Sequence, residues 1–97
     1  MRLTEYEIFV IKNEAIKQFG KNAKVYIFGS RVDDKRKGGD IDIYIETDVK
    51  EELVIKKIQF LVDLKKHIGE QKIDVVINNN SLDKIIFDIA KNEGVRL

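Results

Sequence analysis

The stretch Asp-Ile-Asp-Ile-Tyr-Ile-Glu, residues 40–46, decides the fold, because polar and apolar residues alternate strictly along it. On a strand its three isoleucines would share one face, and its aspartates, tyrosine and glutamate the other. Carboxylates two residues apart on one face repel each other unless a positive charge lies between them. Mg²⁺ prefers oxygen ligands and is usually held by one or two carboxylates plus substrate phosphates. The stretch therefore predicts a strand that offers Asp40 and Asp42 to a divalent metal ion.

A second strand is predicted just upstream, at Val25–Phe28, where the residues are β-branched and aromatic. It stops at Gly29 and Ser30, so Ser30 lies at its carboxyl end. The polar residues 31–37 are expected to begin as a short helical turn, whose free N–H groups favour an anion. Arg31 is a candidate phosphate ligand, because a guanidinium pairs phosphate oxygens bidentately, and equally a surface charge at a turn. The segment predicts a phosphate-holding turn beside the carboxylates.

A third acidic residue, Asp74, lies near the middle of the apolar strand run Lys72–Ile77. Burial of an unpaired charge there would cost several kcal/mol, so Asp74 needs a partner, and the metal site is one. Each feature also has a purely structural interpretation. The Gly-Ser pair can be a strand-ending turn, Asp40 and Asp42 the solvated face of an edge strand, and Asp74 the partner of a lysine.

In combination these motifs resemble the nucleotidyltransferases of the DNA polymerase β superfamily, whose signature is a Gly-Ser, a spacer, Asp-x-Asp and a third acid on a later strand. The matching segments are Gly29-Ser30, Asp40-Ile41-Asp42 and Asp74, within residues 24–77. The short chain and the Asp-Ile-Asp-Ile continuation look most like the minimal nucleotidyltransferase (MNT) group, which often acts as the antitoxin partner of a HEPN-domain protein. A serine often precedes the first acid in the family, whereas Gly39 stands here.

The resemblance implies a role for each matching residue. Gly29 and Ser30 would contact the triphosphate. Asp40 and Asp42 would hold two Mg²⁺ ions, and Asp74 would complete the second metal site. The implied reaction is attack on the α-phosphorus of a nucleoside triphosphate, most often ATP, with release of pyrophosphate. The implied fold is an α/β (α+β) nucleotidyltransferase fold, with helices packed against a small mixed sheet.

Helix signals flank the predicted strands. Thr4 and Glu7 form a capping box for a first helix that ends near Gly20. Its predicted buried face includes Phe9, Ala15, Ile16 and Phe19.

A second helix is predicted to open at Asp48, with Glu51 in a similar box, and to run to about Ile68. Its predicted buried stripe is Val54, Ile58, Leu61, Val62 and Ile68. A turn at residues 78–81 then precedes a last helix over residues 82–89.

Other polar residues are weaker candidates. His67, near a helix end, is expected to be structural. The basic run at residues 35–37 is expected to be a solvated loop, although it could steer a triphosphate or a nucleic acid. Tyr44 could border the nucleotide or only pack.

Length and charge limit the function. The 97 residues predict a single minimal nucleotidyltransferase domain over 1–97, and the formal net charge of +1 argues against general nucleic-acid binding. Without cysteine, a signal peptide or a long apolar span, the sequence predicts a cytoplasmic protein. So short a chain leaves little room for acceptor recognition, which implies a partner, a HEPN-domain protein by resemblance, or a homo-oligomer.

Two functions are consistent with the sequence. The first is a Mg²⁺-dependent enzyme that moves AMP from ATP onto a HEPN toxin. The second is a weakly active or inactive nucleotide-binding module that neutralises its partner by direct binding. Transfer to a small molecule is a third reading, although resembling families perform it with an additional domain.

Overall fold

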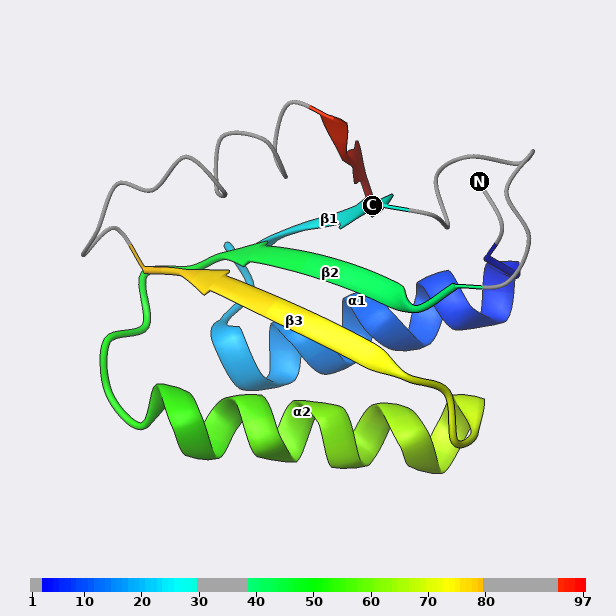
Figure 1. Cartoon of the computed structure of the whole chain (residues 1–97). Helices are drawn as coiled ribbons and strands as arrows, with labels where there is room; N and C mark the ends of the chain where they lie inside the picture. Colours follow the sequence, from blue (N-terminus) through cyan, green and yellow to red (C-terminus); the bar gives the residue numbers. More distant parts are fainter. Residues whose placement is uncertain (1–2, 30–38, 80–92) are drawn as a thin grey trace.

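The computed structural model describes residues 3–29, 39–79 and 93–97. In this part of the chain the elements are α1 (Glu5–Phe19), β1 (Lys24–Phe28), β2 (Ile41–Glu46), α2 (Leu53–Ile68), β3 (Ile73–Asn78) and β4 (Val95–Arg96). The strands form a sheet of order β3-β2-β1-β4, in which β2 and β3 are parallel and the other neighbours antiparallel. Both helices lie on the same face of this sheet (Figure 1). The predicted mixed sheet with packed helices is confirmed.

The parallel pairing of β2 and β3 depends on α2. Parallel neighbours cannot be joined by a tight hairpin, so the chain must return along the sheet between them. Here α2 runs back across one face before β3 begins (Figure 1). This crossover sets the register in which Asp42 lies opposite Asp74.

The first helix begins as its sequence predicts and buries part of its predicted face. Thr4 and Glu7 form the full capping box, and Gly20 ends the helix with φ of +95°. Ala15 and Phe19 are buried, as expected, together with Val10 and Ile11. The prediction for Phe9 and Ile16 is wrong, because they are 61% and 43% exposed. The helix carries two apolar stripes, and only the one at Ile11, Ala15 and Phe19 faces the sheet.

The predicted start of the second helix at Asp48 is also wrong. The helix begins at Leu53, after Glu52, whose φ of +56° is left-handed and whose side chain makes no capping hydrogen bond. Thr47 explains why α2 begins later in the chain than predicted. Its hydroxyl donates to the carbonyl of Phe19 at 2.6 Å and accepts from the N–H of Val49 at 3.1 Å, which fixes an extended connection between sheet and helix.

The buried stripe of α2 is rotated from the predicted one. Val54, Ile58 and Val62 are exposed, whereas Phe60 and Leu64 are fully buried. Leu61 and Ile68 pack partly buried against the core, as predicted. The ring of Phe60 meets that of Phe19 edge to face, with centroids 5.7 Å apart. This aromatic contact joins the two helices over the sheet.

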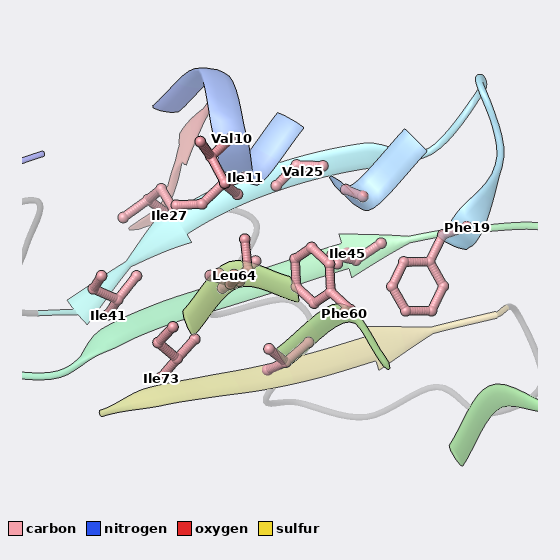
Figure 2. Close-up of a cluster of buried hydrophobic side chains, with 13 residues drawn as sticks. Val10, Ile11, Phe19, Val25, Ile27, Ile41, Ile45, Phe60, Leu64 and Ile73 are labelled. Atoms are coloured by element: carbon pink, nitrogen blue, oxygen red, sulfur yellow. The ribbon is translucent and has the colours of Figure 1, made fainter. Parts of the chain in front are cut away.

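The core lies between the sheet and the two helices. Ile41, Ile43 and Ile45 are completely buried there, which confirms the alternation in the deciding stretch. Figure 2 shows Ile41 and Ile45 among side chains from both helices.

The helix predicted over residues 82–89 lies outside the described residues. The two-residue strand β4 was not predicted, because so short a segment gives no periodic signal; it pairs Val95 with Ile27 of β1. Within the described ranges, no helix has the length and apolar character needed to cross a membrane.

Candidate active site

The sheet face opposite the helices carries the candidate site. Strand register places three residues in one row, with Asp42 of β2 between Phe28 of β1 and Asp74 of β3. Neighbouring strands lie about 4.8 Å apart, so the two carboxyl groups are close neighbours. β2 is paired on both sides, which rules out the interpretation of Asp42 as part of an edge strand.

Asp40 lies just before β2, beside the same row. Its side chain is 37% exposed, and its Oδ2 lies 3.4 Å from Nζ of Lys72, the residue that precedes β3. The N–H of Ile41 donates to the carbonyl of Lys72 at 3.0 Å, which holds the start of β2 against that of β3. Asp40 is therefore held near Asp42 and Asp74 by a backbone hydrogen bond and an ion pair. These three residues form the acidic row.

Asp74 is exposed, contrary to the expectation of a buried charge. Its neighbours Ile73 and Val75 are buried in the core, so alternation along β3, an edge strand of the described sheet, directs Asp74 to the other face. The nearby Lys72 pairs with Asp40. Because Asp74 is exposed, its charge does not need a buried partner. The argument for metal binding therefore depends on its position next to Asp42.

The electrostatics centre on Asp42, which is half-buried. Burial raises the pKa of its carboxyl group above the ordinary value of 3.8, and the charges of Asp74 and then Asp40 raise it further. A hydrogen bond with Asp74 acts in the same direction, while the charge of Lys72 opposes it. Two carboxyl groups that share a proton form a site where a cation can take the place of that proton. The donor set therefore fits a divalent cation.

The acids alone do not form a closed metal cage. Among residues 3–29, 39–79 and 93–97, no three acidic, histidine or cysteine side chains converge in a metal-binding arrangement. The coupling of Asp42 to Asp74 and Asp40 nevertheless shows that their charges act on one another. Mg²⁺ does not require a closed cage, because this ion is commonly held by one or two carboxylates together with substrate phosphates and water.

Gly29, the first residue of the predicted phosphate turn, lies against Asp42. Its φ is +76°, and a Cβ built on it would overlap Oδ2 of Asp42 and lie 3.2 Å from Cγ. Only glycine allows such an approach. The structure therefore places Gly29 directly on the Asp42 carboxylate. Ser30 and Arg31 lie outside the described residues.

A second polar group lies on the same face; the sequence singled out Tyr44 but not its contact with Asn78. The hydroxyl of Tyr44 donates to Oε1 of Glu46 and accepts from Nδ2 of Asn78, each at 3.1 Å. The Tyr44 ring is 1% exposed and packs on Tyr26, with centroids 5.6 Å apart. Tyr44 is thus packed rather than open. Alternation along β2 and β3 could have grouped Tyr44, Glu46 and Asn78 only if the parallel register of the two strands had been known.

The other candidates lie elsewhere. A cavity of about 330 Å³ at the far end of β1 and β2 is lined by Asn22, Lys24, Glu46, Thr47 and Asp48, and by none of the predicted site residues. His67 is exposed at the end of α2 and lines a smaller hollow with Tyr6 and Phe9 of α1. The basic run at residues 35–37 lies outside the described part of the chain. The acidic row and Gly29 remain the only predicted site groups that the described structure brings together.

Comparison with known families gives one match. A family model described as "Polymerase beta, Nucleotidyltransferase" matches residues 11–96. It covers the end of α1, the sheet, α2 and the whole acidic row. No curated protein matches the chain.

Proposed function

Because the chain belongs to the polymerase beta nucleotidyltransferase family, we propose that it is an active Mg²⁺-dependent enzyme that transfers AMP from ATP to a partner protein. The observation that carries the proposal is the Asp42–Asp74 pair, whose raised Asp42 pKa marks a place for a cation, with Gly29 packed on it. Asp40, beside the pair, supplies the third carboxylate.

The residues divide the work of the reaction. An acceptor hydroxyl gives its proton to a carboxylate of the site, with Asp74 as the exposed candidate, and forms a bond to the α-phosphorus. The bond from that phosphorus to the bridging oxygen breaks, and pyrophosphate leaves. Bound Mg²⁺ would neutralise charge on the triphosphate and lower the pKa of the acceptor hydroxyl. Asp40, Asp42 and Asp74 would hold up to two such ions, and the Gly29 backbone would approach the phosphates. Ser30 and Arg31 would complete the phosphate contacts.

The proposed acceptor is a HEPN-domain toxin, which the transfer would silence, so that this chain acts as the antitoxin in the cytoplasm. The support is the family together with the resemblance of the Gly-Ser-Arg and Asp-Ile-Asp-Ile motifs to the MNT group.

Label transfer tests the enzyme proposal. The chain and the co-expressed HEPN-domain protein would be incubated with Mg²⁺ and ATP labelled at the α-phosphate. We expect a labelled partner with the wild type and none with Asp40→Asn or Asp42→Asn. Asp48→Asn is the matched control, since Asp48 is an exposed acid outside the acidic row, and it should label normally. Absence of label with a folded wild type that binds ATP and Mg²⁺ would sink the proposal.

A second function is favoured by exposed apolar side chains on α1, where Tyr6 and Phe9 are 55% and 61% exposed and suit direct binding of a partner. In that case the chain neutralises its partner by covering a surface. Toxin neutralisation would then survive Asp42→Asn, whereas the enzyme proposal requires it to be lost while the two proteins still bind.

A further inference from the structure

The outer face of α2 carries an exposed apolar seam, made of Val54, Ile55, Ile58 and Val62. Their exposed fractions are 72%, 64%, 57% and 43%. Ile55, Ile58 and Val62 are spaced by three and four residues, the spacing that aligns side chains along a helix-pairing seam. Exposed apolar side chains aligned in this way suit an interaction site.

The charges at the two ends of this seam are opposite. Glu51 and Glu52 directly precede α2 and are exposed. Lys65, Lys66 and His67 form its last turn. A parallel pair of such helices would bring like charges together at both ends. An antiparallel pair would bring acids against lysines at both ends, and it would also oppose the helix dipoles.

We propose that this seam is a homodimer interface in which α2 packs antiparallel against α2 of a second copy. A two-fold axis near Ile58 would place Ile58 against its own copy, Val54 against Val62 of the partner subunit, and Glu51 against Lys65 of the partner subunit. A surface that is apolar in the middle and oppositely charged at its ends is complementary to itself, which is what a two-fold interface requires. This self-complementarity selects a second copy over an unrelated protein.

The placement of α2 is compatible with such a dimer. Both helices cover one face of the sheet (Figure 1). Asp42 and Asp74 lie on the other face, because the residues that alternate with them are buried in the core. Pairing through α2 therefore leaves both acidic rows open to substrate. The proposal is independent of nucleotidyl transfer, and a mutant that lacks transfer should still dimerise.

Sedimentation equilibrium tests the central contact. The mass of the wild type should rise with concentration from 11.3 kDa toward twice that value. Ile58→Glu should weaken self-association by about 30-fold or more, as expected for a central interface residue. Ile58→Leu, which keeps the apolar contact, and Ile16→Glu, which makes the same change on exposed α1 surface, should leave it close to wild type. A wild type that stays monomeric, or an Ile58→Glu variant that dimerises normally, overturns the proposal.

A charge exchange tests the antiparallel geometry. Glu51→Lys and Lys65→Glu should each weaken self-association by about tenfold, because two exposed charge pairs change sign in each dimer. An equimolar mixture of the two variants should form a heterodimer tighter than either homodimer. Lys66 is left unchanged because it pairs with the buried Asp63 at 3.9 Å, and Lys12→Glu on α1 serves as the charge control. No recovery on mixing overturns the antiparallel arrangement. If Ile58→Glu loses binding to a HEPN-domain protein but keeps its self-association, the homodimer proposal is overturned.

Discussion

At the scale of single residues, the contact between Gly29 and Asp42 links the backbone turn to the acidic row. Gly29→Ala would add a Cβ where Oδ2 of Asp42 lies and would retain a φ of +76°. We expect the free energy of unfolding to fall by about 1–3 kcal/mol, since a left-handed non-glycine residue is strained. Transfer should fall by about 100-fold, the cost of displacing a reacting group by roughly 1 Å. Denaturant unfolding and label transfer would measure the two effects.

Gly69→Ala is the control that separates the effect of backbone strain from the displacement of the Asp42 carboxylate. Gly69 has a similar φ of +87°, but no atom lies within 4 Å of a Cβ built on it. Its substitution should lower stability while leaving transfer unchanged. Equal loss of transfer in both variants would contradict a local role for the Gly29 contact.

Asp42 is expected to lower the stability of the metal-free protein at neutral pH. Its folded pKa is raised above 3.8, mainly by burial and then by the charges of Asp74 and Asp40. The folded state therefore binds this proton more tightly than the unfolded state, and stability is lost as pH rises through the window from 3.8 to the folded pKa. Asp42→Asn should raise the free energy of unfolding at about pH 7 by roughly 0.2–1 kcal/mol, a range typical of partly exposed charge contacts.

Below about pH 3 this advantage should vanish, because Asp42 is then protonated in both states. Urea unfolding at both pH values would measure it. Mg²⁺ should reverse the order at neutral pH by stabilising the wild type more than the variant. An Asp42→Asn protein less stable than wild type without metal would contradict this account of the acidic row.

At the scale of elements, the two helices begin in different ways. The N–H of Thr4 donates to Oε1 of Glu7 at 2.9 Å, and the N–H of Glu7 donates to Oγ1 of Thr4 at 3.0 Å. Thr4→Ala should lower the free energy of unfolding by about 1 kcal/mol, the usual value of such a cap. Asp48→Ala should change it by less than about 0.5 kcal/mol, because α2 begins at Leu53 and Asp48 does not cap it. Thermal unfolding would compare the two, and an equal loss would restore Asp48 as a cap.

At the scale of the whole molecule, the helices are held to the sheet by one core. Phe60 is fully buried against Phe19, whereas Phe9 is 61% exposed. Phe60→Ala should therefore lower the free energy of unfolding by about 3–5 kcal/mol, the range for a buried aromatic residue. Phe9→Ala removes the same atoms from an exposed position and should cost less than about 1 kcal/mol. Chemical denaturation would decide, and similar losses would show that the α1 face is placed wrongly.

The sequence by itself determined the local parts of this protein. Strict alternation at residues 40–46 determined that the three isoleucines of β2 share the core face, and Thr4 with Glu7 determined the start of α1, because both depend on neighbours within a few residues. The motifs also indicated the family that the comparison found. The roles predicted for Gly29, Asp40, Asp42 and Asp74 stay predictions, now with a stated geometry for each.

Only the tertiary structure decided which apolar stripe of each helix faces the core. Both helices carry two such stripes, and their periodicity does not tell Phe60 from Ile58, since burial depends on the sheet that the helix meets. The row of Asp42 and Asp74 likewise required the parallel register, which the crossover through α2 sets over some thirty residues. Contacts between residues far apart in the chain depend on the whole packed arrangement, and no local pattern encodes them.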